Sequence, residues 1–309
     1  MHLELTQFLS TDNLVLPGLL YTPDVPTSRV FVWLHGMGDG GIFYSQERIT
    51  ALAKKLTQQG IAFFPFNNRG AHNSKTLRQV SDDPETDDGS YQAGTYYEKI
   101  VDCVADIDGA VTFLKRRGMH EFILGGHSTG ANKICVYHAL ADDHNPFTRY
   151  VLAGPGDDSG IHFRELGAST FQKALAYAKR AIERGTPLTT MPLYTGMHPF
   201  SAQSALDILD PNGAYNTFPL YEATTARIGT KQLFAEYRTI QLPMLVLYGE
   251  HDEYTDATGG TAAALDTFRS FTHPSVQESS QFALIPDTDH GFHGQELAFA
   301  RCIAKWVAA

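Results

Sequence analysis

Short apolar runs recur along the chain and are rich in residues that favour β-strands. Two N-terminal segments, 3–9 and 14–21, partly alternate apolar and polar residues, as half-buried antiparallel strands do. The later runs are apolar without alternation, which is typical of strands that helices cover on both faces. These runs are 30–34, 61–66, 122–124, 150–152, 244–248 and 281–285.

Segments with apolar residues at helical spacing lie between these runs. In 46–59 the apolar positions from Ile49 to Leu56 form one stripe, and Gly60 ends it. Strands that alternate with helices predict a wound, mostly parallel α/β sheet. The other predicted helices are 99–117, 129–141, 171–184 and 295–307.

One connection between core strands is much longer than the others. A parallel crossover needs only a dozen or more residues, whereas residues 156–242 separate two consecutive core strands and contain their own helical pattern. We therefore expect 156–242 to form an inserted cap or lid over a core made of 1–155 and 243–309. The alternative is an excursion that covers no catalytic site.

Composition and charge narrow the class of protein and its partners. The chain has 309 residues, of which 43% are hydrophobic and 19% charged, which suits a globular protein. Its formal net charge of −10 repels phosphate backbones and anionic lipid headgroups. We expect no nucleic-acid or membrane partner, and the sequence leaves open whether the chain forms a homo-oligomer.

The negative charge is concentrated in residues 79–98, which contain no Lys or Arg. This pattern predicts a solvated loop, and a gate for cationic or metal-bearing substrates is the alternative. The six carboxylates are Asp82, Asp83, Glu85, Asp87, Asp88 and Glu98.

The cysteines and the N-terminus indicate a cellular compartment. Cys103, Cys135 and Cys302 are widely spaced and form no Cys-x-x-Cys pair, which argues against a disulfide framework or a zinc site. The first residues lack the basic and apolar regions of a signal peptide, and no apolar run is long enough to span a bilayer. We therefore expect a cytoplasmic protein.

A Gly126-x-Ser128-x-Gly130 motif directly follows one apolar run and directly precedes a predicted helix. In such a turn the serine adopts strained backbone angles, and its hydroxyl stands above the sheet. Residues two before and two after the serine nearly collide, so both must be small. The helix that begins at Thr129 directs free amides and its positive dipole end at the reaction centre. The context predicts a nucleophilic serine rather than an ordinary strand-to-helix turn.

A nucleophilic serine needs a base, normally a histidine that a carboxylate orients. Asp252 lies just past the run 244–248, where ligand sites of open α/β sheets gather. His290 follows the last predicted strand, so the chain order is serine, acid, histidine, as expected for this kind of turn. The alternatives are Glu250, Glu253 and Asp256 for the acid, and His251 and His293 for the base.

Glycines follow the first buried strand and predict a second functional loop. An oxyanion needs two backbone N–H donors, and Thr129 is placed to supply one. We assign Met37 as the other donor, with Gly38 as the alternative, because the glycines of 34–41 let the backbone approach a substrate. The loop lacks the Gly-Lys-Ser/Thr and G-x-G-x-x-G patterns of phosphate-binding loops.

The chain resembles the α/β-hydrolase superfamily across residues 30–292. The matching segments are His35-Gly36-Met37-Gly38, Asn68-Arg69-Gly70, Gly126-His127-Ser128-Thr129-Gly130, Gly249-Glu250-His251-Asp252 and Asp289-His290-Gly291. The resemblance implies an α/β-hydrolase fold with an eight-stranded, mostly parallel sheet and a Ser128–His290–Asp252 triad. The His35-Gly36 pair, the long loop after Gly70 and the segment 128–133 are similar to a subset that includes fungal siderophore-ester hydrolases. The 70–97 loop and the large cap depart from the common family pattern.

The expected function is hydrolysis of a carboxylic ester of a small or medium substrate through an acyl-enzyme. The same triad could act on thioesters, lactones, amides or peptides, or C–C bonds, and a non-catalytic ligand-binding protein is the alternative of another class. No metal or organic cofactor is expected, because a loop beside the base explains Asp287, Asp289 and His293 better than a metal site does. Four aromatic residues of the cap are expected to line an apolar pocket: Tyr194, Phe200, Phe218 and Tyr221.

Overall fold

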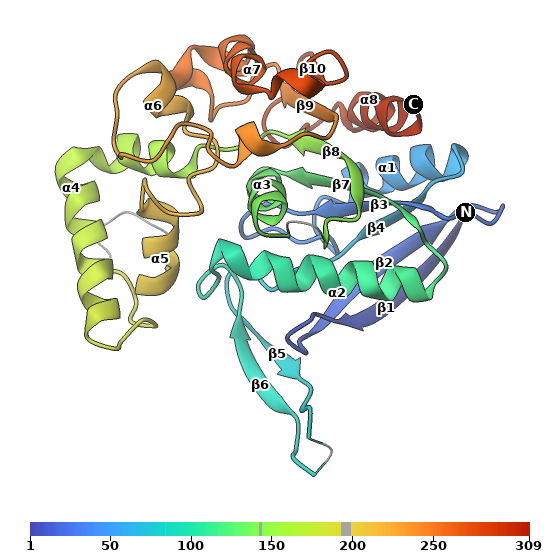
Figure 1. The fold of residues 1–309 in the computed structure, drawn as a ribbon, viewed down its shortest axis with the longest axis horizontal. Coiled ribbons are helices and arrows are strands. Elements are labelled where there is room, and N and C mark those ends of the chain that lie inside the picture. Colours follow the sequence, from blue (N-terminus) through green and yellow to red (C-terminus); the bar gives the residue numbers. More distant parts are fainter. Residues whose placement is uncertain (84, 142–143, 193–198) are drawn as a thin grey trace.

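The computed structural model describes residues 1–83, 85–141, 144–192 and 199–309. Its centre is an eight-stranded sheet with the order β1-β2-β4-β3-β7-β8-β9-β10 (Figure 1). β2 pairs antiparallel with β1 and with β4, and the other neighbours are parallel, which confirms the expected sheet. The strands are β1 His2–Leu9, β2 Val15–Thr22, β3 Arg29–Leu34, β4 Ala62–Pro65, β7 Glu121–His127, β8 Phe147–Ala153, β9 Met244–Gly249 and β10 Gln281–Ile285.

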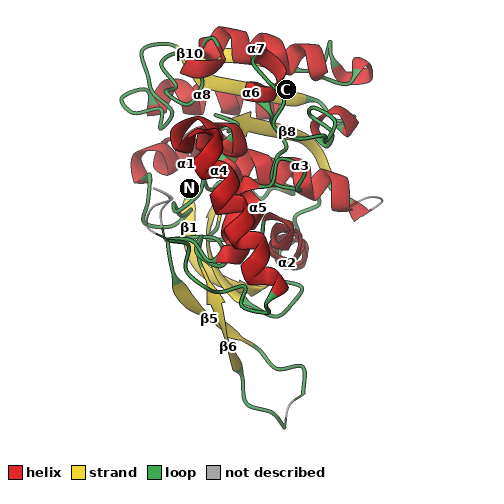
Figure 2. Ribbon diagram, turned by 90° about the vertical axis from the view of Figure 1, so that its left-hand side faces the viewer, coloured by secondary structure: helices red, strands yellow, loops and turns green. Residues whose placement is uncertain are grey.

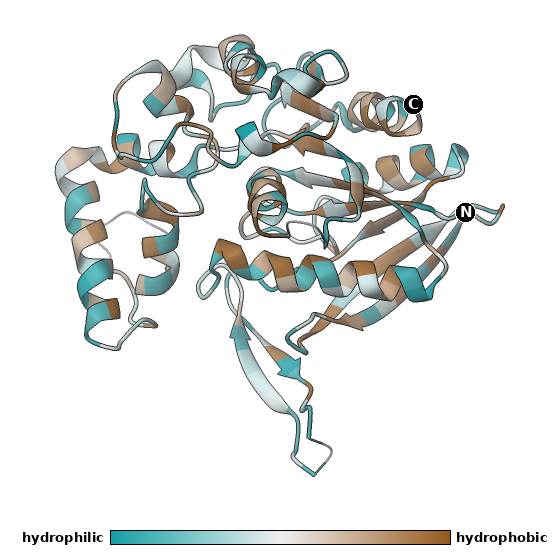
Figure 3. Cartoon of the chain, viewed as in Figure 1, coloured by the Kyte–Doolittle hydropathy of each residue, from teal (hydrophilic) through white to brown (hydrophobic). Residues whose placement is uncertain are grey.

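Helices cover both faces of this sheet, as the apolar runs predict. Neighbouring residues of β3 point to opposite faces, so Val32 belongs to one buried cluster and Trp33 to the other. Figure 3 shows hydrophobic residues along the central strands and on the helices beside them. The first cluster includes residues of α2 (Cys103–Arg116), α3 (Thr129–Ala141) and α7 (Gly260–Phe271), and the second includes residues of α1 (Gln46–Gln58) and α8 (Glu296–Ala308). Short 3₁₀ helices are η1 Ile100–Asp102, η4 Tyr237–Thr239, η5 Asp256–Thr258 and η6 Pro274–Val276.

The long segment between β8 and β9 contains α4 (Asp158–Glu183), α5 (Ala202–Leu209) and α6 (Leu220–Thr224). α4 and α5 lie side by side at one end of the molecule (Figure 1), and Figure 2 views the molecule from that end. α4 begins well before the predicted 171–184 and is interrupted at Gly167, whose φ of 70° and ψ of 153° are not helical. Apolar residues of this segment belong to the same buried cluster as one sheet face. A separate cap domain over 156–242 stays a prediction.

The expected loop 70–97 is wrong in part, because it contains a β-hairpin. β5 (Lys75–Gln79) and β6 (Gly89–Ala93) pair antiparallel and project from the body of the molecule (Figure 1). Most residues of these strands are polar, so the pattern of apolar runs does not reveal them. Only the tip is a loop of exposed carboxylates, whereas Glu98 is buried and pairs with Lys133.

The three cysteines are free thiols, and Cys103 and Cys135 are buried. Across the residues with described placement, no helix combines the length and the apolarity needed to cross a bilayer.

A carboxylate on α5 makes the stability of the fold depend on pH. Burial raises the pKa of Asp207 from 3.8 to about 7, although its side chain accepts a hydrogen bond from the amide of Ile100 at 2.5 Å. Above pH 7 the folded chain therefore carries an ionised carboxylate whose desolvation opposes folding, and this cost disappears as the pH falls towards 4.

We expect D207N to remove this cost. Relative to wild type, its free energy of unfolding should be higher at pH 8 than at pH 4 by on the order of 2 kcal/mol. Urea unfolding of both proteins across this pH range measures the difference. A difference between the two proteins that does not change with pH would contradict the assignment.

Candidate active site

Ser128 lies at the turn between β7 and α3, where the chain has little room. Its φ of 55° is in the left-handed region, which is the strained conformation expected for an exposed nucleophile. A Cβ on Gly126 would lie 2.4 Å from the carbonyl of Gly130, and a Cβ on Gly130 would lie 2.5 Å from the carbonyl oxygen of Leu34. Both positions therefore require glycine, as the motif predicts.

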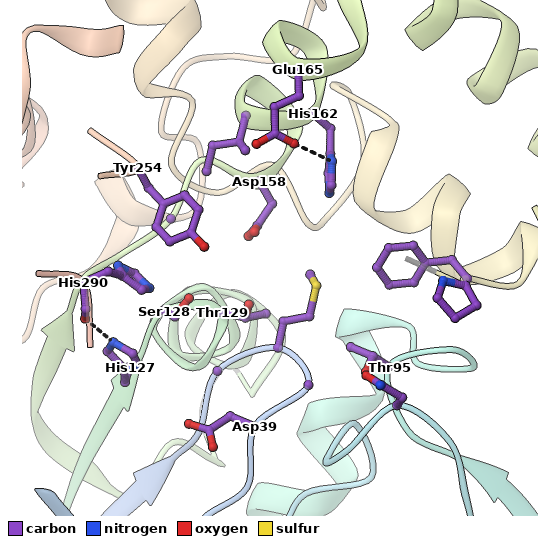
Figure 4. A pocket seen from close by; sticks show the side chains of 18 residues that line it. Asp39, Thr95, His127, Ser128, Thr129, Asp158, His162, Glu165, Tyr254 and His290 are labelled. Carbon is purple, nitrogen blue, oxygen red and sulfur yellow. Dashed lines mark hydrogen bonds and ion pairs between the residues drawn. The ribbon is translucent and has the colours of Figure 1, made fainter. Parts of the chain in front are cut away.

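His290 and Asp252 meet beside this turn, although they come from different loops. Nδ1 of His290 lies 2.7 Å from Oδ2 of Asp252, whose side chain is fully buried. The other carboxylate oxygen accepts the amide hydrogen of Tyr254 at 3.1 Å. Because a carboxylate only accepts, the proton belongs on Nδ1 of His290, and Nε2 is the free basic nitrogen. Figure 4 shows His290 next to Ser128, and both line one cavity.

The alternative acids and bases occupy other places. The carboxylate of Glu253 accepts the backbone N–H of His290 at 3.1 Å. This contact is with the backbone of His290 and not with its ring. His293 pairs with Asp289 at 2.8 Å, and its side chain is 79% exposed. The remaining alternatives Glu250, His251 and Asp256 are exposed.

One exposed group near these loops could hold a metal ion. Ligand atoms of Glu250, His251 and Asp287 lie within 4.8 Å of one another. Oε2 of Glu250 already accepts the backbone N–H of Asp287 at 3.1 Å. Exposed side chains of this kind are common without a metal, and the contact between His290 and Asp252 does not involve them.

Two buried side chains hold the loop that carries His290. The sequence analysis did not single them out. Nε2 of His127 donates to the carbonyl of His290 at 2.8 Å, and burial lowers the pKa of His127 well below its ordinary value. Arg48 on α1 donates to the carbonyl of Gly291 at 2.9 Å and lies 3.6 Å from Asp39. The position of His127 inside the serine motif is the signal that could have identified it.

Gly154 brings the backbone close to the imidazole of His290. Gly154 has a φ of 55°, and a Cβ there would lie 3.1 Å from Nδ1 of His290 and 3.4 Å from Oδ2 of Asp252. The backbone that follows β8 therefore packs against the Nδ1 side of the His290 ring.

The predicted oxyanion donors lie around the serine. Met37, Gly38 and Thr129 line the same cavity as Ser128. A Cβ on Gly36 would lie 3.0 Å from Cβ of Ser128, so the loop after β3 passes directly beside Ser128. The choice of Met37 over Gly38 as the donor stays a prediction.

The cavity has a volume of about 500 Å³. Three of the four predicted aromatic residues are described, and one of these three is among the described lining residues. Phe200 lines the cavity, together with Ile161 and Pro199. Tyr194 lies outside the described residues.

Phe218 and Tyr221 pack against other aromatic rings, and their predicted place at a substrate pocket stays a prediction. Phe218 is fully buried with its ring 5.2 Å from that of Phe268, and Tyr221 packs its ring 5.6 Å from Phe163. Neither is among the described residues that line the cavity.

The described lining of the cavity is acidic. It includes Asp39, Asp158 and Glu165 but no Lys or Arg. Burial raises the pKa of Asp158 to about 6, and within the described part of the chain its Oδ2 has no hydrogen-bond partner. Figure 4 shows Asp158 pointing into the cavity above Ser128. Its position just after β8, at the carboxyl edge of the sheet, is the signal that could have found it.

Comparison with known proteins agrees with this architecture. UPF0613 protein PB24D3.06c of Schizosaccharomyces pombe is 22% identical over 274 residues, which cover 85% of this chain and 81% of that protein. A soluble variant of monoglyceride lipase from Saccharomyces cerevisiae has a TM-score of 0.61 at 14% identity and covers 97% of this chain and 94% of its own. The α/β hydrolase GrgF from Penicillium sp. sh18 has a TM-score of 0.61 at 14% identity, with coverages of 99% and 98%. These two structures show the shared fold.

Family membership follows from a match over most of the sequence. Residues 26–296 match the Hydrolase_4 family, described as "Serine aminopeptidase, S33". Together with the eight-stranded sheet, this match shows that the chain belongs to the serine aminopeptidase family of α/β hydrolases.

Proposed function

We propose that this protein is a serine hydrolase that cleaves a carboxylic ester of a small or medium substrate. One observation carries the proposal: a base and its acid, Nδ1 of His290 and Oδ2 of Asp252, lie 2.7 Å apart at a cavity that also contains a strained Ser128. Family membership supports the same reaction class.

The reaction begins with acyl transfer to the serine. His290 Nε2 takes the proton of the Ser128 hydroxyl, and Oγ attacks the ester carbonyl carbon. The amides of Met37 and Thr129 donate to the oxyanion of the tetrahedral intermediate. The protonated His290 then gives its proton to the leaving alcohol, and Asp252 stabilises the imidazolium in between.

Water then hydrolyses the acyl-enzyme. His290 removes a proton from water, and the resulting hydroxide attacks the acyl carbon. Collapse of the second tetrahedral intermediate returns the proton to Ser128 Oγ and releases the carboxylic acid. Apart from the substrate and this water, the steps use side chains and amides of this chain.

The acidic lining supports a choice among ester substrates. Asp158 and Glu165 line the cavity without a Lys or Arg among the described lining residues, so an anionic acyl group meets like charge. The third carboxylate, Asp39, lies beside Arg48 and contributes less negative charge. Neutral or cationic acyl esters are therefore the proposed substrates.

A fluorophosphonate probe and a matched ester pair test the proposal. The folded wild-type protein should be labelled at Ser128. It should also hydrolyse p-nitrophenyl butyrate with a kcat/KM at least about tenfold above that for p-nitrophenyl hemisuccinate, which has the same acyl length but a negative charge. Absence of both labelling and hydrolysis in folded protein would favour the non-catalytic ligand-binding alternative.

A second candidate is cleavage of an amide or peptide that carries a free amine. The observation that favours it is the Asp158 carboxylate, which faces the cavity with one oxygen unpartnered among the described residues. The triad alone does not select the bond type. Aminoacyl anilides, thioesters, lactones and substrates with a cleavable C–C bond, assayed beside the esters, rank these activities by kcat/KM.

A further inference from the structure

A buried ion pair lies near the oxyanion loop, which we define as residues 35–38, and the proposed reaction does not use it. Lys133 Nζ lies 2.5 Å from Oε1 of Glu98, and the two residues are only 1% and 7% exposed. Burying such a pair costs desolvation and rarely stabilises a fold more than apolar residues would. Lys133 also donates to Oδ1 of Asn68 at 3.2 Å, which extends the pair towards the loop.

Asn68 in turn sets the protonation of a buried histidine. Its backbone N–H donates to Nε2 of His35 at 3.2 Å, so Nε2 carries no proton. The proton of the neutral ring therefore lies on Nδ1, which donates to the carbonyl of Gly36 at 2.8 Å. His35 is 2% exposed, and burial lowers its pKa well below the ordinary value.

This hydrogen bond orients a peptide unit of the oxyanion loop. The carbonyl of Gly36 and the N–H of Met37 belong to one planar trans peptide and point in opposite directions. Fixing the carbonyl of Gly36 towards His35 therefore turns the N–H of Met37 away from His35. The loop passes beside Ser128, since a Cβ on Gly36 would lie 3.0 Å from Cβ of Ser128.

We infer that His35 is a positioning residue that aims the Met37 amide at the oxyanion, and that Asn68, held by the Lys133–Glu98 pair, fixes His35. Lys133 belongs to α3, whose first residue is Thr129, the other proposed donor. One buried network therefore connects to both halves of the oxyanion hole. The inference rests on the proposed function, because it concerns an intermediate of that reaction.

Two substitutions of His35 separate its two hydrogen bonds. In H35N the amide nitrogen is near the place of Nδ1 and can donate to Gly36, but the acceptor for Asn68 is lost. In H35Q the longer side chain can accept from Asn68, but the carbonyl of Gly36 loses the imidazole donor and keeps only the longer hydrogen bond from the amide of Asp39 at 3.3 Å. A structural role predicts that activity follows stability in both variants, whereas a positioning role predicts that activity follows the Gly36 hydrogen bond.

We expect H35Q to lower kcat on the best ester by about 10- to 100-fold, with KM within about twofold, because a displaced donor weakens oxyanion binding. Its affinity for a trifluoromethyl ketone, which forms a tetrahedral adduct on Ser128, should fall by the same factor as kcat/KM. H35N should keep kcat within a few fold of wild type. Wild-type kcat in H35Q, or equal losses in H35N and H35Q, would overturn the inference.

A measurement on the wild-type protein covers the case in which H35Q does not fold. The ¹⁵N chemical shifts of His35 should show a neutral ring with its proton on Nδ1 from pH 5 to 9. A proton on Nε2, or titration within this range, would overturn the inference. If wild type neither reacts with a fluorophosphonate nor hydrolyses any ester, the proposed function fails instead, and the tautomer still tests the placement of His35.

Discussion

Replacing Ser128 by alanine should lower kcat on the best ester substrate by on the order of 10⁵- to 10⁶-fold, because the attacking atom is removed. KM should change much less, since the cavity walls remain. The thermal midpoint should not fall, because alanine lacks the hydroxyl but occupies the same backbone conformation. Steady-state kinetics with corrections for spontaneous hydrolysis, together with thermal unfolding, measure both effects.

Companion variants make this prediction specific. H290A should cost nearly as much as S128A, and the double variant should be no worse than S128A, because the two residues act as a unit. S90A, a serine exposed on β6, should keep wild-type turnover. If S128A kept more than a small fraction of wild-type turnover, the nucleophile would be a different residue.

Replacing Lys133 by methionine should lower the free energy of unfolding by about 3–5 kcal/mol. The substitution keeps the length of the side chain but leaves the buried carboxylate of Glu98 without its cation, whose nitrogen lies 2.5 Å away. Urea unfolding followed by circular dichroism measures the change. The cost should far exceed that of removing an exposed partner, such as Arg78 of the Arg78–Asp88 pair on the hairpin.

A double-mutant cycle tests whether the loss comes from an uncompensated charge. K133M combined with E98Q should be more stable than K133M alone, because the second change removes the unpaired charge. Additive losses in the double variant would show that the two side chains do not depend on each other.

Strong local patterns predicted the elements of the hydrolase core. Partial alternation in 3–9 and 14–21 and apolar runs elsewhere located every strand of the eight-stranded sheet to within a few residues. The central runs were clear because strands buried on both faces tolerate few polar side chains. The turn at Ser128 was equally clear, since crowding at Gly126 and Gly130 restricts both positions to glycine. The placement of Ser128, Asp252 and His290 around one site followed from the same rule, that the carboxyl ends of parallel strands share an edge.

Features that depend on contacts between distant residues were not predictable in this way. The hairpin β5–β6 is mostly polar, so no apolar run marks its strands. Phe218 and Phe200 both belong to the buried core, and only the fold shows that Phe200 also lines the cavity. Glu98 belongs to an acidic stretch in sequence, yet Lys133, 35 residues later, decides its surroundings.

The interruption of α4 at Gly167 separates the part of the helix that lines the cavity from the part that packs in the core. Ile161 and Glu165 precede Gly167 and line the cavity. Phe171 and Leu175 follow Gly167 and belong to the core. We therefore expect substitutions at Ile161 and Glu165 to change which acyl groups the proposed hydrolase accepts, while the second part of the helix continues to anchor the segment. Changes of substrate selectivity are therefore best sought at these two positions, because the core-packed part of α4 stays unchanged.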